Sequence, residues 1–369
     1  MAGKTVASDF NLTKISTKDL SDNLRATIDF GGNLIMIARR GSGKTVISKE
    51  VVKQSGLREV YINLSVSERT DVGGYPNFFG KNDRKYVEYL LPSFFEPLIE
   101  GDVPCVVILD EVDKAESSIW APLLEILQFR SINHRPLKNL RSCLLTGNLQ
   151  SEGGQRPCLP LLDRAEKYLV EANSNHWLDW ASKSGEIHPS ITAFIADHPD
   201  ELFGDVDPGD VYADPSPRGW HLSSNVLNFG EEKRWPHKIL TNKVSGYVGK
   251  KTGLKYSAYF DHYQVLLPIV ERIMKGQEVK GFKDLEMSKQ MVCGMIVCSR
   301  LARLLDNMKN KELPKETENV AKFIKVLDPE MALISVRSQI GLERVVNSGL
   351  DEEKSFDVIL REVAKRING

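Results

Sequence analysis

The chain has 369 residues, long enough for one large domain or two to three smaller ones with a substantial hydrophobic core. Apolar residues make up 41% of it and charged residues 27%, which is the usual mix of a soluble globular protein. Because 49 Lys and Arg residues balance 50 Asp and Glu residues, the net charge is −1, and the whole molecule exerts no long-range attraction on nucleic acid. A local basic surface is compatible with this balance.

Two further features bear on the cellular compartment. The five cysteines are an odd number and their spacing matches no zinc pattern, which favours a reducing environment. The first ten residues contain no apolar core of signal-peptide length, and the apolar run 291–298 is far too short to cross a bilayer. We therefore expect a cytoplasmic protein without a membrane span.

The first predicted elements surround a short loop rich in glycine and basic residues. Residues 19–28 are compatible with a short helix, and the apolar run 33–38 has the character of a buried strand. Apolar residues at helical spacing follow in 46–55, and Gly56 is a suitable helix stop. A strand, a glycine-rich loop and a helix in this order are typical of a phosphate-binding loop.

This loop predicts a nucleotide site. Its backbone N–H groups and the positive end of the following helix can surround a polyphosphate. Lys44 would reach the β- and γ-phosphates, and the Thr45 hydroxyl would hold Mg²⁺. The usual pattern begins with Gly where this chain has Ala38, a small residue with which the loop can still close; the alternative is a plain turn before an ordinary helix. The predicted nucleotide-binding residues are Arg39, Arg40, Gly41, Ser42, Gly43, Lys44 and Thr45.

The next segments alternate between strands and irregular structure. Residues 59–64 predict a strand, and 67–80 predict a Gly/Pro loop that carries three aromatic residues. Residues 86–101 are interpreted as a helix that bends at Pro92 and Pro97.

A second buried strand, residues 104–109, ends in Asp110 and Glu111. Ligands gather at the carboxyl ends of parallel strands, so these acids are candidates for nucleotide chemistry. Asp110 would hold Mg²⁺ through its water shell, and Glu111 would orient and activate the attacking water. The alternative is two solvated acids at a strand end.

The remaining pattern predicts an α/β domain followed by helices. A helix over 117–128 precedes a polar stretch at 130–137 and a strand at 141–148, so that strands and helices alternate as in a parallel sheet. Residues 197–219 are rich in Asp, Pro and Gly and predict a linker or a loop-rich insertion. Helical periodicity then continues to the end, with candidate helices at 256–274, 284–309, 317–327, 331–347 and 352–367.

In this order the motifs resemble those of an AAA+ ATPase, and within that superfamily those of the MoxR family. Residues 109–128 resemble the family's second nucleotide motif and the helix after it, and 70–76 its loop after the second strand. Further matches are the sensor-1 segment in 146–154, the arginine-finger segment in 159–164 and the sensor-2 motif in 216–218. The resemblance covers roughly residues 30–265. Ala38, the Arg39–Arg40 pair and Ala165, where the family usually has Phe, depart from the pattern.

The resemblance implies a fold and roles for individual residues. It implies a large P-loop AAA+ α/β domain over 1–205, a helical lid over 206–275 and a C-terminal helical region over 276–369. Asn148 would contact the γ-phosphate and help to place the water, and Arg164 would act as the arginine finger. Arg218 would reach the nucleotide from the lid.

The function implied is hydrolysis of ATP with Mg²⁺ to ADP and phosphate. The resemblance implies that the chain forms a homo-oligomeric ring, a hexamer, that remodels or activates a partner protein. The resemblance implies a partner with a von Willebrand factor A domain. Two alternatives stay open: an ATPase directed to nucleic acid, as a loader or a restriction-type motor, and a nucleotide-gated scaffold that does not hydrolyse. The preference for ATP over GTP is also open.

Several other residues have two interpretations each. Asn63 could hydrogen-bond Glu111 and hold it inactive, or could cap a turn. Tyr75, Phe78 and Phe79 could grip a client in the pore of a ring, or could pack in the domain core. The three histidines considered are expected to be surface or hydrogen-bonded residues rather than metal ligands: His134, His188 and His221.

Overall fold

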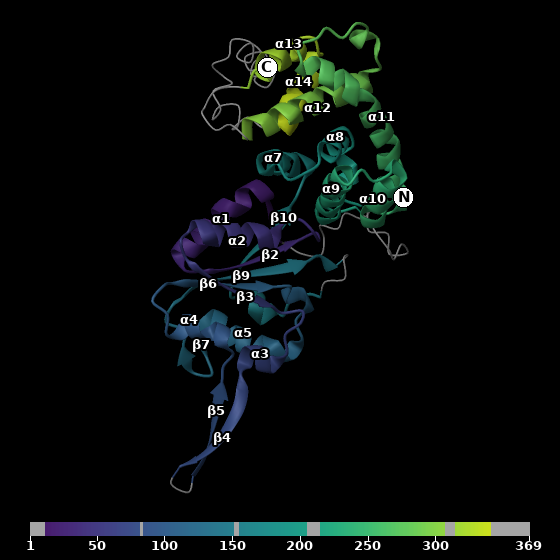
Figure 1. Cartoon of the computed structure of the whole chain (residues 1–369). Helices are drawn as coiled ribbons and strands as arrows, with labels where there is room; N and C mark the ends of the chain where they lie inside the picture. Colours follow the sequence, from purple (N-terminus) through teal and green to yellow (C-terminus); the bar gives the residue numbers. More distant parts are fainter. Residues whose placement is uncertain (1–11, 82–83, 151–154, 205–214, 307–313, 341–369) are drawn as a thin grey trace. The chain divides into compact units, whose positions relative to one another are not determined.

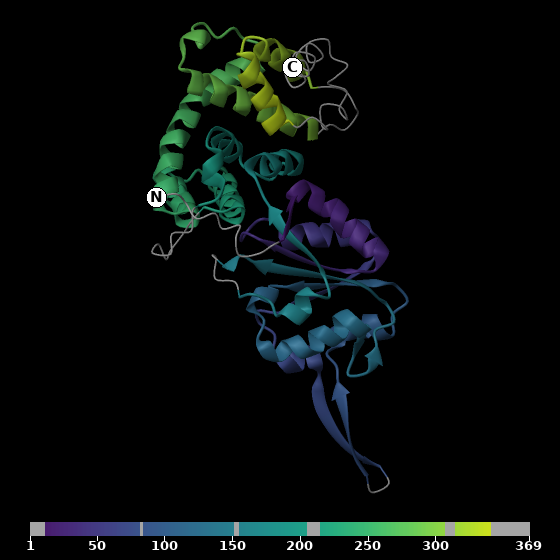
Figure 2. The same ribbon diagram turned by 180° about the vertical axis from the view of Figure 1, so that it is seen from behind.

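The computed structural model describes residues 12–81, 84–150, 155–204, 215–306 and 314–340. The chain divides into two compact units, Met1–Asn173 and Ser174–Gly369. Each unit is described by itself below. Figure 1 labels the elements of both, and Figure 2 gives the view from behind.

The first unit is built on a parallel sheet of six strands in the order β1-β10-β2-β9-β6-β3. Every neighbouring pair in it is parallel, and the strand before the predicted phosphate loop, β2, lies between β10 and β9. All strands therefore end at the same edge of the sheet, which is where a ligand is expected in such a fold. The strands are β1 (Thr13–Ser16), β2 (Asn33–Ala38), β3 (Arg58–Asn63), β6 (Cys105–Asp110), β9 (Leu140–Asn148) and β10 (Glu166–Glu171).

Helices cover both faces of this sheet (Figure 1). Leu34 and Met36 pack on one face with residues of α1 (Thr17–Phe30) and α2 (Lys44–Gln54). Ile35 and Ile37 pack on the other face in a cluster that includes residues of α5 (Ser117–Phe129). Successive residues of a strand point to opposite faces, so a strand buried on both sides becomes continuously apolar. This explains the unbroken apolar runs of β2 and β6.

The predicted α/β fold class, a P-loop parallel-sheet domain followed by helices, is confirmed by this topology. The predicted strands at 33–38, 59–64, 104–109 and 141–148 are confirmed as β2, β3, β6 and β9. Two strands of the sheet, β1 and β10, were not predicted.

The helix predicted over 86–101 is wrong. Residues Arg84–Leu90 form strand β5, which pairs antiparallel with β4 (Tyr75–Lys81), so the loop predicted over 67–80 also contains a strand and the short helix α3 (Arg69–Gly73). Tyr and Val residues favour a strand over a helix here. The prolines after β5 allow only single turns, η2 (Ser93–Phe95) and α4 (Glu96–Ile99). Figure 1 shows this β4–β5 hairpin extending away from the rest of the unit.

A second, smaller hairpin lies in the stretch predicted as a polar excursion. Strand β7 (Ser131–Ile132) pairs with β8 (Arg135–Pro136), and the turn residues Asn133 and His134 both have positive φ angles. Glu125 on α5 accepts from the backbone N–H groups of both turn residues, at 3.1 and 3.0 Å. The carboxylate therefore holds this turn closed.

The second unit is helical in its described part and has one continuous hydrophobic core. The predicted helices at 256–274, 284–309, 317–327 and 331–347 are confirmed over their described residues, with shifted ends, as α11, α12, α13 and α14. The predicted stretches 307–309 and 341–347 and the helix predicted at 352–367 lie outside the described residues. Among the described residues, no helix is long and apolar enough to cross a membrane. The elements are α7 (Ser174–Ser184), α8 (Pro189–Asp197), η5 (Pro199–Leu202), α9 (Pro217–Glu232), α10 (His237–Val248), α11 (Lys250–Met274), η6 (Phe282–Asp284), α12 (Met287–Asp306), α13 (Glu316–Ile324) and α14 (Pro329–Gln339).

Candidate functional site

The glycines of the phosphate loop shape the turn between β2 and α2. Gly41 and Gly43 have φ angles of 72° and 87°, in the left-handed region that glycine adopts without strain. Gly43 is the N-cap of α2 and offers no side chain to its first N–H groups. These N–H groups and the positive end of the helix dipole are therefore available to an anion.

Lys44, the first residue of α2, is buried inside this loop. Its Nζ donates to the backbone oxygens of Ala38 and Arg39, both at 3.1 Å. The loop thus closes with Ala38 in place of the usual glycine. Nζ also donates to Asn148 Oδ1 at 3.1 Å, which brings together two predicted site residues 104 positions apart in sequence.

The two predicted Mg²⁺ ligands are in direct contact. Thr45 Oγ1 donates to Asp110 Oδ1 at 2.9 Å, and the carboxylate is largely buried at the end of β6. Thr146 on β9 donates to the same Asp110 oxygen. A hydroxyl and a carboxylate are oxygen ligands of the kind that Mg²⁺ prefers, so this pair fits the ion. Thr45 and Asp110 would hold it.

Glu111 follows Asp110 in a left-handed conformation, with φ 57° and ψ 45°. Its backbone N–H donates to Thr146 Oγ1 at 3.2 Å, so Thr146 contacts both acids of the motif. Few residues other than glycine adopt this conformation, and non-glycine examples gather at functional sites. The half-buried Glu111 therefore turns out of the strand at the sheet edge that carries the phosphate loop.

Asp113 extends the site, although it was not among the predicted site residues. Asn148 Nδ2 donates to Asp113 Oδ2 at 3.3 Å, and Asp113 is only 1% exposed. Among the described residues, its other oxygen, Oδ1, has no hydrogen-bond partner. A third acid close to Asp110–Glu111 was the signal that could have drawn attention to it.

Of two residues on β3, Tyr61 contacts a site acid and Asn63 caps a turn. Asn63 Oδ1 accepts from the N–H and the hydroxyl of Ser65, at 3.0 and 2.8 Å, so Asn63 caps a turn as its second interpretation predicted. Tyr61, which was not predicted to be in the site, donates to Asp110 Oδ2 at 2.8 Å. Burial and the hydrogen bond to the Asp110 carboxylate together raise the pKa of Tyr61 to about 12. The Tyr61 hydroxyl therefore keeps its proton and stays a donor at neutral pH.

The other loop side chains differ in their surroundings. Arg39 is half-buried and Arg40 is exposed. The Ser42 hydroxyl is buried and has no hydrogen-bond partner among the described residues. A donor left unpaired in a loop of this shape is compatible with a phosphate oxygen as its partner.

Arg164 lies at the opposite end of the sheet from the phosphate loop. Its backbone oxygen accepts from Asn33, the first residue of β2, whereas the loop follows the last residue, Ala38. Six residues of strand separate these ends by about 17 Å. The Arg164 side chain donates to Gln128 Oε1 at 2.8 Å through Nε and to the Pro160 backbone oxygen at 2.5 Å through one terminal nitrogen. Within one chain, therefore, Arg164 is not brought to the phosphate loop.

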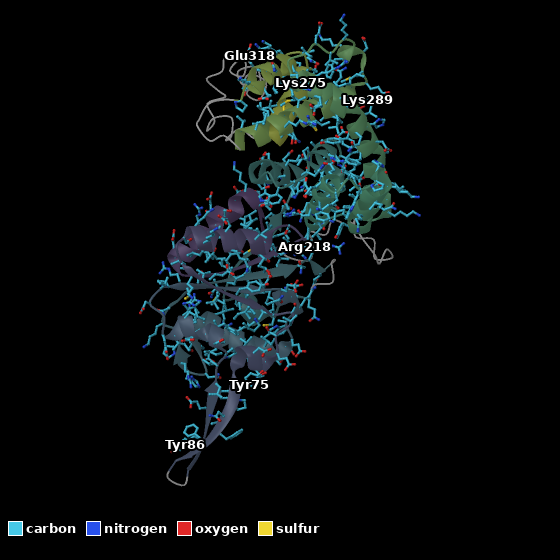
Figure 3. All side chains as sticks on the ribbon, in the orientation of Figure 1. Tyr75, Tyr86, Arg218, Lys275, Lys289 and Glu318 are labelled. Atoms are coloured by element: carbon cyan, nitrogen blue, oxygen red, sulfur yellow. The ribbon has the colours of Figure 1, made fainter. Side chains whose placement is uncertain are left out.

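Arg218 belongs to the second unit (Figure 3). Ser216 is the N-cap of α9 and accepts from the Gly219 N–H at 3.1 Å, and Arg218 is exposed in the first turn of that helix.

The three histidines named in the sequence analysis differ in burial. His188 is buried, with its Nε2 3.1 Å from Glu231 Oε2, while His134 and His221 are more accessible. The described residues contain no cluster of three or more potential metal ligands from His, Cys, Asp and Glu.

No protein-family model matches the sequence, and no curated protein matches it. Among solved structures, the chain is similar to the RuvB Holliday junction branch migration motor of Thermotoga maritima, with 12% identity, a TM-score of 0.38, and coverage of 75% of this chain and 86% of that one. It is also similar to Hsp104 in a closed state with ATPγS and casein, with 16% identity, a TM-score of 0.33, and coverage of 46% and 35%. These similarities concern the fold, and the site rests on the residues described above.

Proposed function

We propose that this chain binds ATP with Mg²⁺ and hydrolyses it to ADP and phosphate as an AAA+ ATPase. The observation that carries the proposal is the convergence of three sequence-distant motifs at one sheet edge. Lys44 contacts Asn148, Thr45 contacts Asp110, and Glu111 follows directly. Phosphoryl transfer needs a cradle for the phosphates, a metal ligand set and a group that orients the water, and these residues supply all three.

The roles follow from the chemistry of each group. The loop N–H groups and the Lys44 ammonium bind the phosphates, with Arg39, Arg40 and Ser42 at the rim. Mg²⁺, when bound, neutralises the charge that develops on the phosphate oxygens. Glu111 accepts a proton from the attacking water, and Asn148 helps to place that water. Arg218 binds the nucleotide from a helical lid, residues 206–275.

The position of Arg164 supports an oligomer. Since Arg164 lies at the far end of β2 from its own phosphate loop, it serves as a finger only for the nucleotide of a neighbouring subunit. A closed ring gives every loop such a neighbour. We infer a homo-oligomeric ring, a hexamer in analogy to the MoxR family, whose helices move with the nucleotide state.

The β4–β5 hairpin supports a protein client. Tyr75, Phe78 and Phe79 are 52%, 75% and 43% exposed, so they do not pack in the domain core. Figure 3 shows Tyr75 and Tyr86 along this hairpin. Exposed aromatic residues on a projecting element mark a binding surface for another chain. The ATPase cycle would remodel or activate that partner. By analogy with the MoxR family, the partner is a protein with a von Willebrand factor A domain.

Phosphate release by the purified chain tests the proposal. With ATP and Mg²⁺ we expect turnover that is lost with EDTA and lost in Lys44→Ala, and GTP in place of ATP measures the nucleotide preference. Tight nucleotide binding without phosphate release would favour the scaffold alternative. A salt-dependent affinity for DNA that stimulates turnover would favour a nucleic-acid-directed ATPase.

A further inference from the structure

A tyrosine on the edge strand of the sheet contacts the proposed Mg²⁺ carboxylate. Tyr61 lies on β3, which pairs with β6, the strand that ends in Asp110. The Tyr61 hydroxyl donates to Asp110 Oδ2 at 2.8 Å. Thr45 and Thr146 both donate to the other oxygen, Oδ1. Among the described residues, Tyr61 is thus the partner that holds Oδ2.

The tyrosine ring is held in turn by α2. Lys49 Nζ lies 4.0 Å from the centre of the Tyr61 ring and 2.9 Å from Glu59 Oε1. Thr45 and Lys49 are four residues apart on α2 and therefore share a helical face. The four residues are therefore linked in a ring of contacts. Thr45 contacts Asp110, Asp110 contacts Tyr61, Tyr61 contacts Lys49, and α2 connects Lys49 to Thr45.

We propose that Tyr61 is a positioning residue for the Mg²⁺ site, acting by fixing the Asp110 carboxylate so that Oδ1 faces Thr45. This inference rests on the proposed function. A threonine hydroxyl that donates its proton to a carboxylate keeps its lone pairs directed at a cation. Rotation of the carboxylate would break that arrangement, and the Tyr61 hydrogen bond opposes the rotation. Hydrogen bonds to charged groups are stronger than neutral ones, so the restraint is substantial.

The alternative role of Tyr61 is to stabilise the edge strand, and Mg²⁺ dependence separates the two. The variant Tyr61→Phe removes the hydroxyl but keeps the ring under Lys49. Affinity for a fluorescent ADP analogue is measured at increasing Mg²⁺ concentration and in EDTA, and Mn²⁺ binding in the presence of ADP is followed by electron paramagnetic resonance. We expect Tyr61→Phe to need about three- to tenfold more Mg²⁺ or Mn²⁺ for half-saturation, with affinity in EDTA unchanged.

Two controls sharpen the result. Tyr168→Phe removes another tyrosine hydroxyl that donates to a carboxylate, that of Glu166 at 3.4 Å, away from the site, and should leave the Mg²⁺ requirement unchanged. In an Asp110→Ala background, which leaves Tyr61 no acceptor at this position, Tyr61→Phe should have no further effect, because its action passes through the Asp110 side chain.

The outcomes distinguish the proposals. An unchanged or lowered Mg²⁺ requirement in Tyr61→Phe overturns the role of Tyr61 but leaves the proposed nucleotide site unaffected. A loss of affinity that is equal with and without Mg²⁺ also overturns it, because the damage is then general. If the wild-type chain binds the analogue without any dependence on Mg²⁺, the proposed function itself fails, and the role of Tyr61 fails with it.

Discussion

Asn148 donates through Nδ2 to Asp113 Oδ2 at 3.3 Å, and this bond fixes which way its amide points. Lys44 can only donate and the Asp113 carboxylate can only accept, so Oδ1 of Asn148 must face Lys44 and Nδ2 must face Asp113. A phosphate that takes over the Lys44 ammonium would leave the Asn148 oxygen free to accept from a water. The buried acid thereby sets the chemistry that Asn148 offers.

The first prediction concerns Asp113. Asp113→Ala should lower turnover about tenfold, because Asn148 loses its orientation, with little change in nucleotide affinity. Asp113→Asn keeps an oxygen acceptor and should recover most of the activity. Asp102→Ala removes an exposed acid from the same unit and is the control. Steady-state phosphate release and nucleotide titration measure both quantities, and equal rates in Asp113→Ala and wild type would refute the role.

Lys44 and Glu111 should separate binding from turnover. Lys44→Ala should abolish nucleotide binding, since the ammonium contacts phosphate in the ground state. Glu111→Gln should bind nucleotide normally and lose turnover, since Glu111 acts mainly on the attacking water. Lys53→Ala, at the exposed end of the same helix, should behave like wild type. Hydrolysis at the wild-type rate in Glu111→Gln would remove Glu111 as the base.

Arg164 should act on the nucleotide of a neighbouring subunit. Arg164→Ala should lower turnover about 10³-fold, because the developing charge on the phosphoryl group loses its cation. Mixed with Lys44→Ala subunits, which are also inactive, it should regain partial activity, since some interfaces then join an intact loop to an intact finger. Gln128→Ala removes only a local partner of Arg164 and should be much milder. No recovery in rings verified to be mixed would exclude the role.

Arg218 should link the nucleotide to the second unit. Arg218→Ala should weaken nucleotide binding about three- to tenfold and lower turnover, because a guanidinium that binds phosphate oxygens is lost. Lys238→Ala, an exposed basic residue of α10, is the matched control. Titration with a fluorescent nucleotide measures the affinity. Unchanged affinity and unchanged turnover in Arg218→Ala would leave Arg218 without a part in the site.

Glu125 should make stability depend on pH. Burial alone would raise its pKa, but hydrogen bonds from His134, Ser131 and Asn133 outweigh it and hold the pKa below the ordinary value. A depressed pKa means that the ionised form is stabilised by folding, so its contribution is present above the unfolded pKa and is lost as the pH falls through the folded one.

The test of Glu125 is thermal unfolding over a pH series. Glu125→Gln should lower Tm most near pH 7, and the difference from wild type should shrink below about pH 4. Glu100→Gln, which replaces an exposed acid of the same unit, is the control variant. A difference that stays constant with pH would mean that the charge of Glu125 is not involved.

Local patterns were sufficient for the phosphate loop and for the acids at the end of β6. Lys44, Thr45 and Asp110 each follow from a motif within a few residues, and parallel pairing then brings them together. Tyr61 and Asp113 could not be assigned in this way. Their roles depend on contacts between strands and loops that no spacing within one segment encodes.

The hairpin was missed for a related reason. Residues 84–90 contain apolar side chains on both sides, which in a compact domain would mean a buried helix or strand. Because both faces of this hairpin are exposed, its apolar and polar residues follow neither the alternation of a half-buried strand nor the periodicity of a helix. The role of Arg164 likewise could be named only by resemblance, because a contact between subunits has no signature in one chain.

The exposed β4–β5 ribbon has a consequence for handling the protein in solution. Both of its faces carry apolar side chains, with Phe78 and Val87 paired on one and Phe79 and Tyr86 on the other. Among the described residues, β4 and β5 form a sheet of their own, so each strand has an outer edge. Such edges and apolar faces promote aggregation at high protein concentration. Light scattering would then report two processes together: formation of ordered oligomers, which responds to nucleotide, and non-specific aggregation, which does not. A Phe78→Ser variant should suppress the second process alone, so that the particle size at saturating nucleotide reports the number of subunits.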